Sequence, residues 1–247
     1  ADFKMRIFNA DGSEVEMCGN GIRCLGKYIW DKNLKTQYAV RSTQKHLSIE
    51  TLAGIIRLEK MGGLFKVDMG EPILEPEKIP INLSLEFRVQ SSELKKKNAS
   101  RITHHASPII NYPLKIKGKT FKVTCVSMGN PHAIIVVKNA QAVPLSHYGS
   151  VIENHKLFPN RTNVEFIQIL NRKNIKMRVW ERGAGETMAC GTGASASGVA
   201  SALLGLTRRK VTVHLPGGKL LIEWSEKNNH VYMTGPAVKV FEGIIEL

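Results

Sequence analysis

The stretch KMRIFNADGSEVEMCGNGIRCLG, residues 4–26, occurs a second time as KMRVWERGAGETMACGTGASASG, residues 176–198. The two copies align without a gap at a constant offset of 172 residues, and 8 of the 23 positions are identical. Each copy carries a cysteine at the same place, Cys18 in the first and Cys190 in the second. A repeat of this kind indicates duplicated structural units. We therefore expect two related lobes, each with one of these cysteines.

A shorter match follows each cysteine segment later in the chain. VDMGEP, residues 67–72, resembles VYMTGP, residues 231–236. The second copy is also preceded by VSMGNPHAIIVV, residues 126–137, whose counterpart in the first copy would lie before residue 1. If the lobes are true duplicates, we expect the opening strands of the first lobe to lie upstream of this sequence.

Each copy has the pattern of a strand, a loop and a helix. Residues 3–7 and 175–179 alternate apolar and charged side chains, which is typical of half-buried strands. After the first cysteine, Ile22, Leu25 and Ile29 recur at helical spacing. After the second, residues 191–206 are small or apolar throughout, which predicts a buried helix. Both cysteines are therefore expected at or near a helix N-terminus.

That position has chemical consequences for a thiol. Free backbone N–H groups and the helix dipole favour negative charge, and they favour the thiolate form of cysteine. Glycines that follow both cysteines leave these N–H groups open to a ligand. A carboxylate fits such a site as well as a phosphate does.

Several other functions lack their sequence signatures. The GKT at residues 118–120 has Pro113 where a phosphate loop needs glycine, and neither glycine run fits the dinucleotide motif. No CxxC is present, and no ligand spacing supports a metal site of the cysteines with His132.

Of the other two cysteines, Cys24 is expected to pack against the protein. A redox pair of Cys18 and Cys190, or two inert cysteines, remain as alternatives.

Composition limits the partners and the compartment. The formal net charge is +14, but the Lys and Arg residues are spread along the chain and no RNA-binding aromatic signature occurs. No apolar run approaches the length of a membrane helix. Four cysteines are sparse for a disulfide scaffold. We expect a cytoplasmic protein in a reducing compartment that binds neither nucleic acid nor a membrane.

Two equivalent thiols that face each other suggest one particular reaction. A planar carbanion between them could lose a proton to one thiolate and gain a proton from the other thiol. Backbone N–H groups from both helix starts could hold the substrate carboxylate and its growing charge. The sequence thus favours a two-base racemase or epimerase.

Five motifs together carry a family resemblance. They are FNADGSEVEMCGNGIRC (8–24), MGNPH (128–132), TNVEF (162–166), ERGAGETMACGTGA (181–194) and PGG with YMTGPA (within 216–237). With them, nearly the whole chain resembles the diaminopimelate epimerase family. The resemblance implies an α/β (α+β) fold of two similar lobes. Each lobe is a curved sheet or barrel around a central helix, and the active site lies in the cleft between them.

The resemblance also implies an activity and its residues. The family interconverts LL- and meso-diaminopimelate for lysine and cell-wall synthesis without pyridoxal phosphate or metal, and it suggests a homodimer. Cys18 and Cys190 would be the two bases, and His132 would support the site. The amides that would hold the reacting carboxylate are those of Gly19, Asn20, Gly191 and Thr192. The residues that would bind the remaining polar groups of the substrate are Asn9, Asn130, Asn163, Glu181 and Arg182.

The lobes are expected to divide near residue 78. Residues 1–78 would form the first lobe, joined by the tail 237–247, and residues 79–236 the second. The basic stretch 91–105 is interpreted as a surface excursion. The family's opening GNDF-type loop and an early glutamine would lie upstream of residue 1.

Two rival functions remain: a racemase of the proline racemase type, and a non-catalytic or thiol-redox protein on the same fold.

Overall fold

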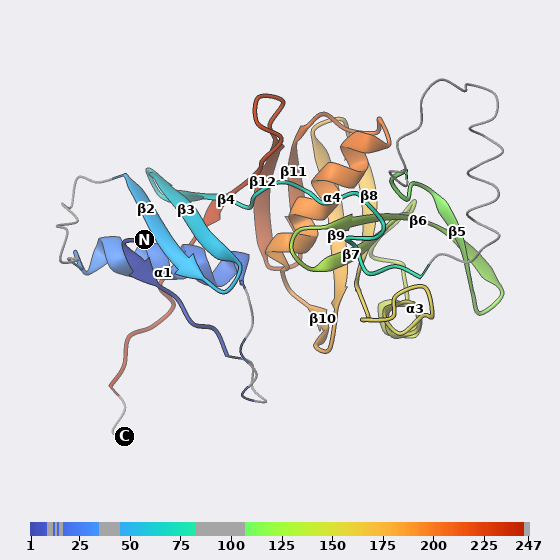
Figure 1. Ribbon diagram of the computed structural model, residues 1–247, viewed down its shortest axis with the longest axis horizontal. Coiled ribbons are helices and arrows are strands. Elements are labelled where there is room, and N and C mark those ends of the chain that lie inside the picture. The colour runs from blue at the N-terminus through green and yellow to red at the C-terminus, as the bar shows by residue number, and fades with distance from the viewer. Residues whose placement is uncertain (9–11, 13, 15–16, 35–44, 83–106, 245–247) are drawn as a thin grey trace.

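The computed structural model describes residues 1–8, 12, 14, 17–34, 45–82 and 107–244. Figure 1 shows a smaller body, which holds the N-terminal helix and the strands up to Asp68, beside a larger body that holds residues 107–236. One sheet of thirteen strands runs through the described part of both bodies. Its order is β1-β2-β3-β4-β13-β12-β11-β9-β8-β7-β6-β5, with β10 paired to β9.

The smaller body consists of β1 (Phe3–Lys4), α1 (Gly19–Asp31), β2 (His46–Thr51), β3 (Gly54–Met61) and β4 (Leu64–Asp68). The first strands of the larger body are β5 (Tyr112–Ile116), β6 (Lys119–Ser127) and β7 (Pro131–Val136). Then come α3 (Leu145–Glu153), β8 (Asn163–Asn171), β9 (Asn174–Glu181), β10 (Gly185–Thr187) and α4 (Gly191–Leu203). The chain continues with β11 (Lys210–Leu215), β12 (Gly218–Trp224) and β13 (Val231–Pro236).

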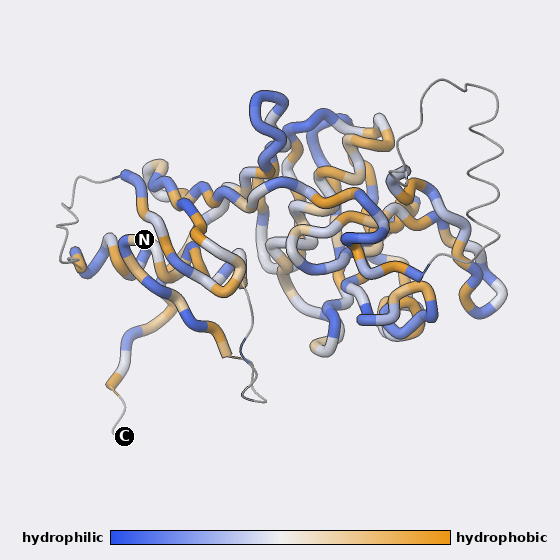
Figure 2. The backbone as a smooth tube through the Cα atoms, viewed as in Figure 1, coloured by the Kyte–Doolittle hydropathy of each residue, from blue (hydrophilic) through white to orange (hydrophobic). Residues whose placement is uncertain are grey.

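Helix α4 lies inside the larger body and contacts strands on all sides of it, β6 to β9 and β11 to β13. Every residue from Gly191 to Ser201 is buried. Small side chains permit this close approach, since a Cβ built on Gly198 would lie only 2.7 Å from Ile222. The turn between β12 and β13, in contrast to this buried helix, is hydrophilic (Figure 2). The expected buried helix after Cys190 is confirmed, and so are the strand before it and the helix after Cys18.

The two copies of the repeat meet at two points. β4, which ends at Asp68 within VDMGEP, pairs antiparallel with β13, which is VYMTGP, and Asp68 lies opposite its own counterpart Tyr232. A Cβ built on Gly191 would lie 3.3 Å from the Cα of Gly19, again its counterpart. Contacts between equivalent positions are what a two-fold axis produces. The duplicated units therefore face each other across a local two-fold axis.

The mixed α/β class and the two-lobed arrangement are confirmed, but some details differ. The strand expected over residues 3–7 is only Phe3–Lys4, which pairs in parallel with β2 at the end of the sheet order. The expectation that Cys24 packs is wrong, because Cys24 is exposed. The excursion over 91–105 lies outside the described residues. The division at residue 78 and the joining of the tail to the first lobe stay predictions.

Candidate active site

Cys18 and Cys190 occupy the same structural position. Each is the N-cap residue of a 13-residue helix and has extended backbone angles, φ −132° and ψ 110° for Cys18 and φ −125° and ψ 117° for Cys190. Their surroundings differ, because Cys18 is partly exposed whereas Cys190 is buried. Cys18 Sγ accepts a hydrogen bond of 3.3 Å from Gly21 N, a backbone donor in the first turn of α1.

The two helix starts are in contact. Gly19 and Gly191, the first residues of the two helices, approach so closely that a side chain on either would strike Met233 or the other glycine. Asn20 Nδ2 crosses from α1 to donate 3.2 Å to Ala189 O, the residue before Cys190. The structure thus brings together both cysteines' helix starts, which lie 172 residues apart in the sequence.

Arg23, which sequence reasoning did not single out, fixes this junction. Its buried guanidinium donates to Gly19 O at 3.0 Å, to Asn20 Oδ1 at 3.1 Å and to Pro236 O at 3.2 Å. Burial lowers the pKa of Arg23 from its usual value. The side chain joins the first turn of α1 to the end of β13, and it holds Asn20 in place beside Ala189.

Cys190 lies in an environment that disfavours its thiolate. Burial raises the pKa of Cys190 well above its usual value, and a negative charge on Glu181 or on Glu165 raises it further. Hydrogen bonds involving Thr192 and Gly193 act in the opposite direction. At neutral pH Cys190 is therefore a thiol, a form suited to donate a proton.

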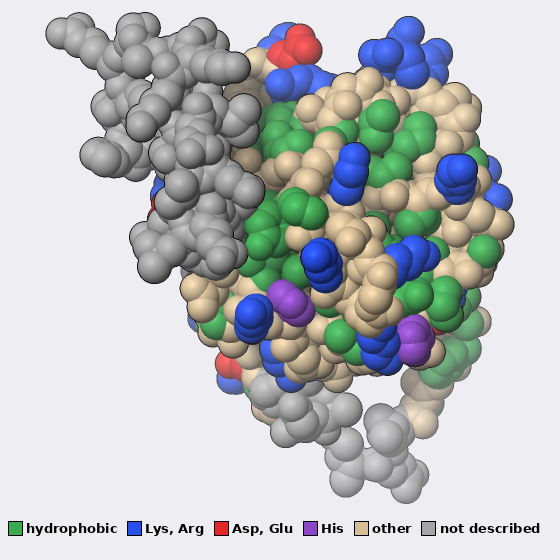
Figure 3. Space-filling view, turned by 90° about the vertical axis from the view of Figure 1, so that its right-hand side faces the viewer, with side chains coloured by type: hydrophobic (Ala, Val, Ile, Leu, Met, Phe, Trp, Pro, Cys, Tyr) green, Lys and Arg blue, Asp and Glu red, His purple; other side chains and the backbone are tan. Residues whose placement is uncertain are grey.

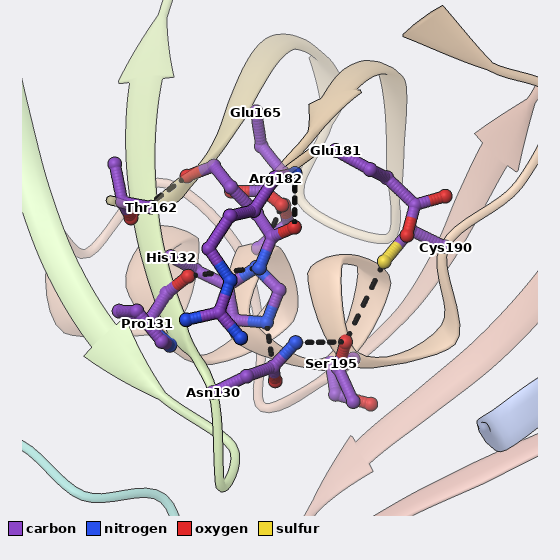
Figure 4. Close-up of polar contacts among 12 residues, drawn as sticks. Asn130, Pro131, His132, Thr162, Glu165, Glu181, Arg182, Cys190 and Ser195 are labelled. Atoms are coloured by element: carbon purple, nitrogen blue, oxygen red, sulfur yellow. Dashed lines mark hydrogen bonds and ion pairs between the residues drawn. The ribbon is translucent and has the colours of Figure 1, made fainter. Parts of the chain in front are cut away.

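A chain of polar contacts leads from Cys190 into the core (Figure 4). Cys190 Sγ lies 3.5 Å from Thr192 Oγ1, which accepts from Asn130 Nδ2 at 3.3 Å. Asn130 Oδ1 lies 3.0 Å from His132 Nε2, and His132 Nδ1 lies 2.7 Å from Glu165 Oε1. His132, expected in a supporting role, is thus connected to Cys190 through two residues expected to bind substrate. Glu165 was not predicted as part of the site.

Asn163, Glu181 and Arg182 lie at the turn between β9 and β10, residues 182–184. Asn163 Nδ2 donates to Pro131 O at 3.0 Å, and its Oδ1 accepts from Arg182 N at 2.9 Å. The amide of Asn163 therefore braces the backbone in this structure. Glu181 accepts a hydrogen bond from the Thr187 hydroxyl. The Arg182 side chain is exposed and donates to Asn160 O at 3.3 Å. Of the expected binding residues, Asn9 lies outside the described residues.

Glu153 of α3, also missed by sequence reasoning, contacts the same turn between β9 and β10. Its carboxylate accepts from Trp180 Nε1 at 2.7 Å and from Gly183 N at 2.9 Å, and it forms an ion pair with Arg161. Burial alone would raise the pKa of Glu153, but these hydrogen bonds outweigh it and hold the pKa below its usual value. The backbone next to Arg182 is thus fixed by a buried carboxylate.

We expect Glu153→Gln to lower the free energy of unfolding at pH 7 by about 2 kcal/mol, since hydrogen bonds to a charged group are lost. A carboxyl whose pKa is lowered by folding stabilises the protein above its unfolded pKa, and that stabilisation disappears as pH falls through the folded value. The difference between wild type and variant should therefore be constant near neutral pH and shrink below about pH 4. Urea unfolding from pH 3 to 7 measures it; a difference independent of pH would contradict the assignment.

Further observations concern partners and cofactors. On the face shown in Figure 3, Lys and Arg side chains stand singly among hydrophobic ones and do not form a stripe. In the part of the chain that the structure describes, no helix is long and apolar enough to cross a membrane. The same residues contain no group of three or more His, Cys, Asp and Glu side chains placed to hold a metal ion. The expectations of no cofactor and no nucleic-acid partner stay predictions.

Solved structures share this fold at low sequence identity. A phenazine biosynthesis protein of the PhzF family from Bacillus anthracis superposes with a TM-score of 0.63 at 18% identity, covering 98% of this chain and 80% of that one. A hydroxyproline epimerase from Agrobacterium vitis gives 0.63 at 12% identity, covering 94% and 67%. These likenesses show the fold that this chain shares with both proteins.

Sequence relatives define the class of enzyme to which this chain belongs. A protein of Acetivibrio thermocellus named diaminopimelate epimerase is 54% identical over all of this chain and 80% of its own length. One of the same name from Moorella thermoacetica is 51% identical over 98% of this chain and 79% of its own length. The family profile described as diaminopimelate epimerase matches residues 1–75 and 124–240. The chain belongs to the diaminopimelate epimerase family.

Proposed function

We propose that this chain interconverts LL- and meso-diaminopimelate by moving the proton of one α carbon between two thiols. The observation that carries the proposal is the contact of two equivalent helix starts, each capped by a cysteine, across a local two-fold axis. Two such thiols flank a substrate from opposite sides, so that one removes the α-proton while the other supplies a proton to the opposite face.

The starting roles of the two thiols follow from their surroundings. Cys190, whose pKa burial raises, begins as the proton donor. The role of base in this direction is then assigned to Cys18, whose sulfur accepts a hydrogen bond from Gly21 N. After one turnover the roles are exchanged, which suits the reverse reaction. Both directions of epimerisation need the same two residues.

The carboxylate next to the reacting carbon needs donors that hold its developing charge. Helix starts at Gly19 and Gly191 supply backbone N–H groups and the positive ends of two dipoles. We assign the amides of Gly19, Asn20, Gly191 and Thr192 to this carboxylate. With two helix N-termini at one position, no pyridoxal phosphate or metal is required for the reaction.

The far end of the substrate carries a second amino group and carboxylate. Arg182 offers a planar guanidinium that matches a carboxylate, and Glu181 offers a counter-charge for an ammonium group. Asn9, Asn130 and Asn163 complete the assigned binding residues, with His132 in support. These groups favour a substrate with two polar ends over proline, whose ring has none beyond the reacting centre. We further propose that the enzyme acts in the cytoplasm as a homodimer.

The test compares substrates under reducing conditions. We expect NMR in D₂O to show α-proton exchange and epimerisation of LL-diaminopimelate, and exchange slower by at least about 100-fold for L-lysine, which lacks the distal carboxylate and its charge-assisted hydrogen bonds. L-proline should not exchange detectably. Faster turnover of proline would favour the proline racemase type. Turnover of none of them, in a folded and reduced chain, would refute the proposed function.

A further inference from the structure

Glu165 is a buried carboxyl beside the site, and the steps assigned above do not use it. It lies on β8 with its side chain wholly buried, opposite Ile134 of β7 and against the first turn of α4. A Cβ built on Gly193 would lie 2.6 Å from Glu165 Oε1, so only glycine leaves room for this carboxyl under the helix start. The close fit places Glu165 directly behind the turn that carries Cys190.

The contacts of His132 determine where its ring proton lies. Asn130 donates through Nδ2 to Thr192, so its Oδ1 faces His132 Nε2. An amide oxygen has no hydrogen, and Nε2 must therefore be the protonated nitrogen. In a neutral imidazole Nδ1 is then an acceptor, and the hydrogen in the 2.7 Å contact must come from Glu165 Oε1.

A second observation favours the acid form of Glu165. Its Oε2 is buried and has no hydrogen-bond partner among the described residues. A buried carboxylate with one oxygen unpaired is costly, whereas the carbonyl oxygen of a neutral acid tolerates the same position far better. Burial also raises the pKa of Glu165, against the opposing effect of His132.

We propose that Glu165 is a positioning residue that acts as a neutral acid: it donates its proton to His132 Nδ1, holds the ring as the Nε2–H tautomer, and thereby directs the hydroxyl of Thr192 at Cys190. The order of donors is Glu165, His132, Asn130 and Thr192, each donating to the next group, with the sulfur of Cys190 last.

This order assists Cys190 in two ways. Thr192 Oγ1 accepts from Asn130 and keeps its own hydrogen for the sulfur, which stabilises the thiolate left after Cys190 gives up its proton. A neutral Glu165 also adds no negative charge beside that thiolate. The charged group that faces Cys190 is then Glu181, which stays as a counter-charge for the substrate.

A matched pair of variants tests the donor. Glu165→Gln keeps the shape and an N–H donor for Nδ1, whereas Glu165→Met keeps the unbranched shape and removes the donor. Ile167→Val, on the same face of β8, controls for loss of packing without touching the polar chain. Thermal unfolding of all three checks that they are folded.

The first readout is the tautomer of His132, from long-range ¹H–¹⁵N correlation spectra of the imidazole ring. We expect a protonated Nε2 and a bare Nδ1 in wild type, in Glu165→Gln and in Ile167→Val between pH 6 and 8, and a mixture of tautomers in Glu165→Met. A doubly protonated ring, or a proton on Nδ1 in wild type, would overturn the proposal.

The second readout is the pH dependence of Cys190 alkylation by iodoacetamide, followed by peptide mass spectrometry. In Glu165→Met the midpoint should rise by about one pH unit, which is about tenfold in thiolate at a given pH, because the Thr192 bond is no longer directed. Glu165→Gln and Ile167→Val should match wild type. A Glu165→Gln midpoint that moves with Glu165→Met would contradict a neutral acid. The inference rests on the proposed role of Cys190, but neither readout uses substrate, so a wrong substrate assignment would leave both unchanged.

Discussion

Replacing Cys190 or Cys18 by alanine is expected to lower kcat for epimerisation of diaminopimelate by about 10³-fold or more. Each variant removes one of two groups that move a proton in the rate-determining chemistry, and such a group contributes about 10² to 10⁴-fold. Because the roles of the thiols alternate between directions, each variant should fail with the LL substrate and with the meso substrate. Initial rates in both directions, with reductant present, measure this.

The matched control is Cys24→Ala, since Cys24 lies on the exposed face of α1, only six residues from Cys18. It should retain full activity. Conversion of the two site cysteines to a disulfide should abolish activity reversibly, because a disulfide is neither acid nor base. Full activity of either site variant would exclude the two-base assignment, and it would favour a thiol-redox or binding role for this fold.

The second large effect is expected at Arg23, where Arg23→Met should lower the free energy of unfolding by about 3 kcal/mol. The guanidinium satisfies two backbone carbonyls and the side chain of Asn20 in a buried place, and methionine fills the volume but leaves these acceptors unpaired. Loss of Asn20's support beside Ala189 should also raise KM more than it lowers kcat. Urea unfolding and steady-state kinetics give both quantities.

Lys27→Met on the same helix is the control for charge removal. Lys27 pairs with Asp31 at the surface, a contact worth about 0.5 kcal/mol or less. If Arg23→Met destabilised the protein no more than Lys27→Met does, the structural role assigned to the buried guanidinium would be wrong.

The repeated segment predicted most of what positions the site. Two cysteines in equivalent glycine-rich contexts predicted two helix starts, and the structure has Cys18 and Cys190 as the N-caps of two helices of equal length. This succeeded because capping and helical periodicity are local properties, readable within a few residues of the chain.

The parts that sequence reasoning missed depend on distant contacts. Arg23 bonds to Pro236, 213 residues away, and Glu165 to His132, 33 residues away. Nothing local marks either as functional. A carboxyl within an apolar run, as in NVEFIQI (163–169), is the one signal that could have indicated Glu165, since charged residues are rarely buried without a partner. Cys24 was wrongly expected to pack because helical periodicity identifies one buried face but not which other faces stay open.

The most direct test of two thiols acting on opposite faces is the isotope content of the first product formed in D₂O. Two-base catalysis predicts that meso product formed from protiated LL-diaminopimelate carries deuterium at the inverted carbon from the earliest time points, while the recovered substrate keeps its hydrogen. The donor thiol exchanges with solvent before each turnover, and the abstracted hydrogen stays on the other sulfur. Early product that retains the substrate's own hydrogen would show one base serving both faces, and would contradict the assignment of Cys18 and Cys190.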